Sequence, residues 1–245
     1  MRPIFPCTAR MCHPPPMHPD FWQRYDDHPV PPPLGAEASA RMPDGRWLRL
    51  PLRDYGSVAV TGFIANQASF GVLRPLCGWM AAAARGFGAE AVLGLPTLGH
   101  VFGGPVAEAL GHPNWVAAGY SRKNWYDPAF SAPTTSSTAP DARRMWLDPR
   151  VLHRLQGRRV LLVDDVISTG SSALAGLALL ETAGVRPVGL AVAMAQGDRW
   201  CGGWPGDVPV AAGFATPLYR RDAAGAWVAD EATRAAVRLP QGEAA

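Results

Sequence analysis

Residues 160–172 read VLLVDDVISTGSS, and this stretch decides the fold. Its first four residues are continuously apolar, which is typical of a strand buried on both faces. Two adjacent carboxylates, Asp164 and Asp165, follow the strand, and a loop of serine, threonine and glycine comes next. Serine and threonine favour the first positions of a helix, so we expect a helix to begin here. The stretch therefore predicts a strand, a polar loop and a helix in direct succession.

The loop has the features of an anion cradle. The start of a helix leaves backbone N–H groups unpaired and carries the positive end of the helix dipole. Gly170 lets the backbone approach a ligand closely, and the hydroxyls of Ser168, Thr169, Ser171 and Ser172 add hydrogen-bond donors. Such a loop suits a phosphate group. The two carboxylates before it can accept hydrogen bonds from neighbouring sugar hydroxyls, so a phosphorylated, polyhydroxylated ligand is expected.

Strand, loop and helix patterns alternate on both sides of this stretch. Strands are expected at residues 91–95, 115–118 and 188–193, and helices at 101–110 and 172–182. This alternation predicts an α/β fold, a parallel sheet flanked by helices. Ligands of such sheets bind beyond the carboxyl ends of the strands, which is where the two aspartates lie.

The N-terminal part has a different pattern. Residues 1–45 contain two runs of proline and are expected to form an extended or poorly ordered leader, with the domain starting at residue 46. Residues 46–52 alternate between polar and apolar, and 57–61 follow after a turn, which predicts an antiparallel hairpin. Ser69 is expected to cap a helix that ends near Ala84.

The stretch VLLVDDVISTGSS resembles the signature for phosphoribosyl pyrophosphate (PRPP) of type I phosphoribosyltransferases, and it matches that pattern at every position. In that family the acidic pair, here Asp164 and Asp165, holds the 2′ and 3′ hydroxyls of ribose. The loop after it, here residues 168–172, holds the 5′-phosphate. The resemblance implies the fold of that family, with a parallel sheet flanked by helices.

The same resemblance implies a domain from residue 46 to residue 245. The core covers about residues 66–200, and a small hood, which selects the base, is built from 46–62 and 196–220. An aromatic ring of the hood can stack on a base. The candidates singled out in the second segment are Trp200, Trp204, Phe214 and Tyr219.

Other segments match the family in position. Thr97, Leu98, Gly99 and His100 occupy the place of the pyrophosphate-binding loop, where the family carries a strained or cis peptide. The plain alternative is an ordinary turn from strand to helix. For His100 the options are a general acid or base, or a loop-capping or solvent-exposed role.

Arg122 and Lys123 resemble the basic pair that meets pyrophosphate in adenine and orotate phosphoribosyltransferases. The alternative for this pair is a solvated surface. The segment 121–148 that includes the pair matches the family's mobile catalytic loop, in which Trp125, Tyr126 and Phe130 are candidates to seal the site.

The function implied is transfer of the 5-phosphoribosyl group of PRPP to a nitrogenous base, a purine being favoured, with release of pyrophosphate. Asp164 and Asp165 would act on Mg²⁺ indirectly, through PRPP. PRPP and a small base are the expected partners, and homodimers are usual in the family. The first alternative is a non-catalytic protein of the same fold that binds PRPP or a nucleotide to regulate another process. The second is a transferase that uses a different acceptor.

Composition bounds the remaining options. The chain has 245 residues and is 48% hydrophobic, which suits one α/β domain with appendages. A net charge of +3 without a basic block or stripe predicts no nucleic-acid partner. No apolar run reaches the roughly 18 residues of a membrane span, and no signal peptide is recognised. Four cysteines without a Cys-x-x-Cys pair favour a reducing cytoplasm.

Two other phosphate-binding classes fit less well. A Walker-type loop is absent from the sequence. Response-regulator receiver domains also begin with a strand ending in two aspartates, but they need another aspartate at the end of a later strand. Asp207 precedes its predicted strand, so it does not meet this requirement.

Overall fold

The computed structural model describes residues 21–134 and 143–240. A five-stranded core sheet, in the order β10-β9-β8-β4-β5, runs through it, and every neighbouring pair is parallel. This confirms the predicted parallel sheet. Its strands are β4 (Ala91–Gly94), β5 (Val116–Ala117), β8 (Val160–Ile167), β9 (Pro187–Gln196) and β10 (Val210–Thr216).

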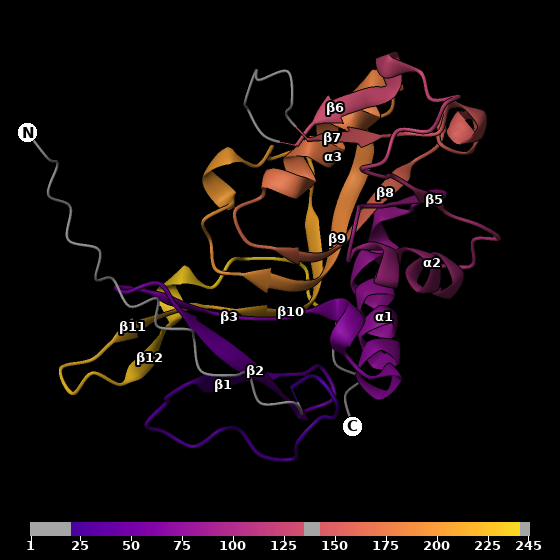
Figure 1. Cartoon of the computed structure of the whole chain (residues 1–245). Coiled ribbons are helices and arrows are strands. Elements are labelled where there is room, and N and C mark those ends of the chain that lie inside the picture. The colour runs from indigo at the N-terminus through magenta and orange to yellow at the C-terminus, as the bar shows by residue number, and fades with distance from the viewer. Residues whose placement is uncertain (1–20, 135–142, 241–245) are drawn as a thin grey trace, which may run out of the picture.

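Helices cover both faces of the core sheet (Figure 1). On one face, α1 (Phe70–Ala84) and α2 (His100–Ala109) pack with Leu161 and Val163 of β8 in one hydrophobic cluster. On the other, α3 (Ser171–Thr182) packs with Val160 and Leu162. The successive residues of β8 alternate between the two faces, which is why a continuous apolar run is needed there.

A second, antiparallel sheet, called the hood from here on, has the order β1-β2-β3-β11-β12. That it selects a base stays a prediction. In Figure 1 the indigo strands from the N-terminal side lie beside the yellow strands from the C-terminal side. The predicted hairpin is confirmed, because Leu52 of β2 pairs with Thr61 of β3. The strands are β1 (Glu37–Arg41), β2 (Trp47–Asp54), β3 (Ala59–Thr61), β11 (Leu218–Arg221) and β12 (Trp227–Asp230).

The hood differs from the predicted one in both of its segments. The strand at 210–216 belongs to the core sheet, while β12 lies beyond residue 220, where the prediction ended. The expected leader, 1–45, also contains hood structure, since β1 lies within it. The run of alternating residues in β1 is too short to stand out beside the prolines.

The chain is anchored to the domain before β1. Trp22 is 2% exposed, and its indole Nε1 donates to the backbone oxygen of Gly62 at 3.1 Å. Its carbonyl accepts from the backbone nitrogen of Ser69 at 2.9 Å, just before α1. Ser69 caps α1 as predicted, because its Oγ accepts from Val72 N. Residues 1–20, with Cys7 and Cys12, lie outside the described part.

The segment 121–148 contains a short two-stranded sheet. β6 (Ser131–Pro133) pairs antiparallel with β7 (Arg144–Trp146). Ala132 and Met145 are buried in the hydrophobic cluster that also contains α3 residues. Strands of three residues are too short for their period to be read from sequence, and their burial against α3 stabilises them.

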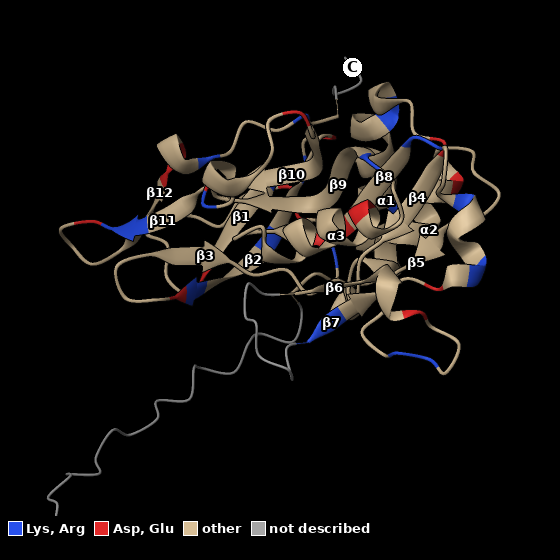
Figure 2. Ribbon diagram, turned by 90° about the horizontal axis from the view of Figure 1, so that it is seen from above, with Lys and Arg blue, Asp and Glu red and all other residues tan. Residues whose placement is uncertain are grey.

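Charged residues are scattered over many elements in Figure 2, without a basic stripe along any one of them. The longest helix in the described residues is α1, with 15 residues. Across the described ranges, no helix has the length and apolarity to cross a lipid bilayer.

Candidate active site

The acidic pair lies near the carboxyl end of β8, with β9 and β4 on either side. Asp164 is 4% exposed, whereas Asp165 is half-buried. Asp164 Oδ1 accepts a hydrogen bond from the backbone nitrogen of Asp165 at 2.9 Å. The pair thus consists of one enclosed carboxyl group and one that a ligand can reach.

Burial changes the protonation of both groups. It raises the pKa of Asp164 well above the ordinary range for a carboxyl group, and the negative charge of Asp165 adds to that rise. Burial also raises the pKa of Asp165. The charged form loses hydration inside the protein, and two adjacent negative charges repel. The pair therefore resists carrying two charges at once.

This pKa rise predicts a pH-dependent stability. Folded Asp164 keeps its proton at pH values where the unfolded chain releases it, so its contribution to stability is full below about pH 4 and is lost as the pH rises toward its folded pKa. Asp164→Asn removes this loss, and its Oδ1 can still accept from the nitrogen of Asp165. We expect the thermal midpoint of the variant to exceed that of the native protein increasingly from about pH 4 to pH 8.

The control is Asp207→Asn, the same change at an exposed carboxylate that pairs with Arg186. Its thermal midpoints should follow those of the native protein. Parallel curves for Asp164→Asn and the native protein would contradict the pKa rise.

The predicted phosphate loop leads from β8 into α3. Gly170 has φ +82°, a left-handed conformation that glycine adopts without a steric penalty, and α3 begins directly after it at Ser171. Thr169 and Ser171 are exposed, with their hydroxyl oxygens 3.1 Å apart. The free backbone N–H groups of the first turn of α3 adjoin these hydroxyls, which is the arrangement expected of an anion cradle.

The second predicted cradle lies between β4 and α2. The Pro96–Thr97 peptide bond is cis, as the resemblance implies. Gly99 packs so tightly on the acidic pair that a Cβ atom there would lie 2.7 Å from Asp164 Oδ1. Thr97 is exposed and Leu98 half-buried. The loop and the acidic pair are therefore in direct contact.

A cleft of about 360 Å³ runs from the acidic pair to the hood. Its core side carries the half-buried aspartate and the start of the phosphate loop, and its hood side comes from β2, β3 and the residues after them. The side chains that line it include Tyr55, Phe63, Asp165, Ser168, Gln196 and Arg199. The cleft thus combines hydrogen-bonding groups with an aromatic wall, as ligand sites commonly do.

Comparison with known proteins agrees with this geometry. Residues 73–201 match the family model described as phosphoribosyl transferase domain. The chain is 36% identical to the adenine phosphoribosyltransferase of Frankia casuarinae over 141 residues, which are 55% of this chain and 67% of that protein. The chain belongs to the type I phosphoribosyltransferase family.

Another similar relative is the adenine phosphoribosyltransferase of Kineococcus radiotolerans, 36% identical over 62% of this chain and 78% of that protein. A crystal structure of an adenine phosphoribosyltransferase aligns with a TM-score of 0.51 at 20% identity. The aligned part covers 66% of this chain and 95% of that one. At this identity the likeness shows the fold alone. The core of this phosphoribosyltransferase is thus common to the family.

The four aromatic residues predicted for the hood lie outside the cleft. Trp200 and Trp204 pack edge to face at 6.1 Å, and their indole nitrogens donate to the backbone oxygens of Gly197 and Val208. Phe214 belongs to the core cluster over α1, and Tyr219 packs within the hood sheet. The aromatic lining of the phosphoribosyltransferase cleft instead comes from Tyr55 and Phe63.

The structure does not bring the predicted basic pair into the cleft. Arg122 and Lys123 are exposed, and the Arg122 guanidinium lies 5.3 Å from the ring centroid of Trp146. The aromatic residue next to them, Trp125, donates its indole N–H to Asp148 at 3.1 Å. Their predicted roles at pyrophosphate and in sealing the site stay predictions.

His100 contacts the two residues that flank β5. Its Nε2 lies 2.8 Å from the backbone oxygen of Ala118, and its ring packs edge to face on Trp115 at 5.6 Å. These contacts favour the loop-capping role over that of a general acid or base.

Sequence reasoning missed four polar residues around the site. Gln196 and Arg199 lie at the carboxyl end of β9 and just after it, the edge at which parallel sheets bind ligands. That rule could have identified both of them. The guanidinium carbon of Arg143 lies 3.4 Å from the ring centroid of Tyr120. Burial raises the pKa of Tyr120, the charge of Arg143 opposes that rise, and the charge of Asp164 adds to it. No local pattern marks this second pair.

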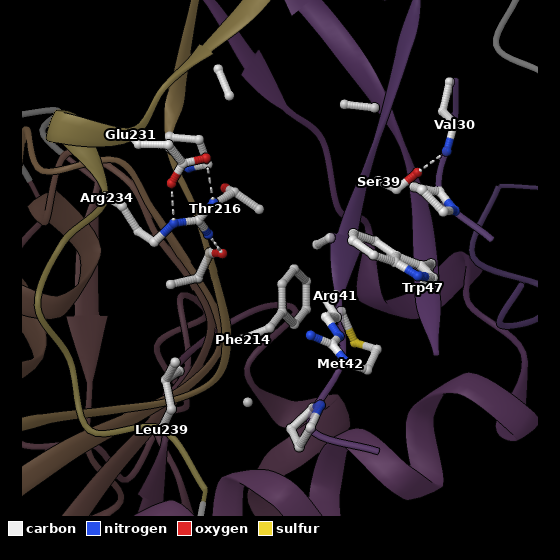
Figure 3. Close-up of a pocket in the computed structure, with 18 of the residues that line it drawn as sticks. Val30, Ser39, Arg41, Met42, Trp47, Phe214, Thr216, Glu231, Arg234 and Leu239 are labelled. Atoms are coloured by element: carbon white, nitrogen blue, oxygen red, sulfur yellow. Dashed lines mark hydrogen bonds and ion pairs between the residues drawn. The ribbon is translucent and has the colours of Figure 1, made fainter. Parts of the chain in front are cut away.

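The described residues also form a larger cavity, of about 680 Å³. Figure 3 shows Trp47 and Met42 on one of its walls and Phe214 and Arg234 on the opposite one. The acidic pair and the phosphate loop do not line this cavity. The smaller cleft is therefore the candidate active site, because residues of the acidic pair and of the phosphate loop line it.

Proposed function

We propose that this protein transfers the 5-phosphoribosyl group of PRPP to a purine base, adenine, and releases pyrophosphate. The observation that carries the proposal is a single cleft that connects Asp165 and the start of the phosphate loop, Ser168 and Thr169, to an aromatic wall. The relatives described above are named adenine phosphoribosyltransferases, which supports adenine as the acceptor.

PRPP would lie along the carboxyl edge of the core sheet. Its 5′-phosphate would bind the loop of Ser168, Thr169, Gly170, Ser171 and Ser172, where the start of α3 supplies N–H groups. Its ribose hydroxyls would donate to the acidic pair.

Pyrophosphate would bind the loop of Thr97, Leu98, Gly99 and His100, which touches the acidic pair at Gly99. Arg122 and Lys123 would reach it from the segment after β5.

Mg²⁺ suits this arrangement as a cofactor. The described residues contain no group of three or more His, Cys, Asp or Glu side chains that could enclose a metal ion. Mg²⁺ commonly binds through one or two carboxylates and the oxygens of a phosphate ligand. In this site the oxygens of PRPP would supply the ligands, and Asp164 and Asp165, which hold the ribose hydroxyls, would act on the ion indirectly. When bound, it would neutralise charge on pyrophosphate.

Adenine would enter from the hood. Phe63 lies at the end of the hairpin, 6% exposed, and packs edge to face on Phe214 with ring centroids 6.4 Å apart. A ring held this firmly offers a flat surface for a base. The hood would thus comprise β1 to β3 with β11 and β12, on a core that starts near residue 66 and extends past residue 200 to include β10.

The reaction would be a displacement at C1 of the ribose. A bond forms from a base nitrogen to C1, the bond from C1 to the pyrophosphate oxygen breaks, and pyrophosphate leaves with the electron pair. The proton on that base nitrogen passes to the departing pyrophosphate or to water. Catalysis would come from positioning and from charge stabilisation, without a covalent nucleophile. Asp165 would place a negative charge near the ribose while its carbon is cation-like.

A panel of bases tests the proposal. Purified protein, Mg²⁺ and PRPP are mixed separately with adenine, guanine, hypoxanthine, uracil and orotate, and pyrophosphate release is followed. We expect release with adenine and at most weak release with the others. Release with another base alone would replace adenine as the acceptor. Binding of PRPP without release for any base would instead indicate a regulatory protein.

A further inference from the structure

Gln196, the last residue of β9, joins two parts of the cleft that are far apart in the sequence. It is 6% exposed. Its Oε1 accepts from Ser168 Oγ at 2.5 Å and from Arg199 Nη2 at 3.3 Å, and its Nε2 donates to the backbone oxygen of Thr61 at 2.5 Å. Ser168 begins the phosphate loop, and Thr61 ends β3 in the hood.

These contacts fix the orientation of the Gln196 amide. In the opposite orientation its NH₂ group would face the guanidinium of Arg199, which can only donate, and its oxygen would face the carbonyl of Thr61, which can only accept. In that orientation, both of these contacts would leave buried polar groups without a hydrogen-bond partner, which is costly. The side chain therefore has one stable setting, with an acceptor toward the phosphate loop and a donor toward the hood.

Both ends of this connection are themselves held. Arg199 Nη2 also donates to Ser168 Oγ at 2.8 Å, so the hydroxyl of Ser168 both donates and accepts within the protein. Thr61 Oγ1 lies 2.9 Å from Thr216 Oγ1 at the end of β10. A shift of either end is therefore transmitted through Gln196 to the other.

We propose that Gln196 is a positioning residue that sets the hood wall of the cleft relative to the phosphate loop, so that phosphate binding pre-organises the place of the base. This rests on the proposed function for the identity of the two ligands. A phosphate that contacts Ser168 or Arg199 perturbs the two groups bonded to Gln196 Oε1. The base meets the hood beside Thr61, the group bonded to Nε2.

Two substitutions distinguish the hydrogen bond of Gln196 to the hood from its hydrogen bonds to the phosphate loop. In Gln196→Glu a carboxylate oxygen still accepts from Ser168 and Arg199, but the other oxygen faces the carbonyl of Thr61 and cannot donate to it. We expect KM for the base to rise about tenfold, the size of one lost buried hydrogen bond, and KM for PRPP to change far less. Gln196→Met loses the hydrogen bonds to Ser168 and Arg199 as well as the one to Thr61, so it should raise both KM values.

Gln156 provides a matched control. Its Nε2 also donates to a backbone oxygen, that of Ala183 at 3.5 Å, and it lies outside the cleft. Gln156→Glu and Gln156→Met should leave both KM values unchanged. An equal rise of the two KM values in Gln196→Glu, or no rise in either, would overturn the positioning role.

Hydrogen–deuterium exchange tests the coupling without turnover, with ribose 5-phosphate as the probe. In the native protein we expect the probe to slow exchange in residues 168–172 and also around Thr61. In Gln196→Glu only the first segment should be slowed. Equal slowing around Thr61 in the two proteins would overturn the coupling alone, while no slowing of either segment in the native protein would overturn the proposed ligand as well.

Discussion

Replacing Asp165 by asparagine is expected to lower kcat/KM for phosphoribosyl transfer by about 10³, the scale found when a preorganised electrostatic contact is removed. Asp165 is the half-buried member of the pair and lines the cleft. Asparagine keeps its shape but removes the negative charge and one acceptor oxygen. Initial rates of pyrophosphate release at varied PRPP and base concentrations measure the effect.

Asp207→Asn is the matched control, since it removes an exposed carboxylate that contacts Arg186. It should retain the native rate. A thermal midpoint near the native one would show that Asp165→Asn still folds. If this folded variant kept more than about a tenth of the native kcat/KM, the electrostatic role of Asp165 would be wrong.

Gly99→Ala is expected to disturb stability and PRPP binding together. Its Cβ would lie 2.6 Å from the backbone oxygen of Leu95 and 2.9 Å from the Cα of Asp164. These are backbone atoms, so no flexible side chain can move aside. The loop after β4 must then separate from β8, which should lower the free energy of unfolding by about 1–3 kcal/mol.

The separation also moves the predicted pyrophosphate loop away from the acidic pair. We expect KM for PRPP to rise by about 10² because displacements near 1 Å can have effects of that size. Denaturant unfolding and initial rates measure the two effects. Gly78→Ala in α1, where a Cβ would meet nothing within 4 Å, should change neither KM nor the fold. Native behaviour of Gly99→Ala would contradict the close contact.

The sequence by itself determined the centre of this protein. The apolar run of β8, the acidic pair and the hydroxyl-rich loop are contiguous, so their strand, loop and helix could be read from residues 160–172 alone. The flanking strands and helices were also predictable, since each has its own period and helix ends carry local signals such as Ser69. Local patterns and the rule for parallel sheets were sufficient to place both cradles on one edge.

Only the tertiary structure decided what surrounds that centre. The hood joins strands from the two ends of the chain, and the aromatic wall of the cleft comes from Tyr55 and Phe63 rather than from residues after 196. Gln196 meets a residue 28 positions away and another 135 positions away. The unequal burial of two adjacent aspartates likewise depends on Gly99, which lies far earlier in the chain. Such contacts have no local period or cap, because they arise only when the sheets have packed and distant residues have become neighbours.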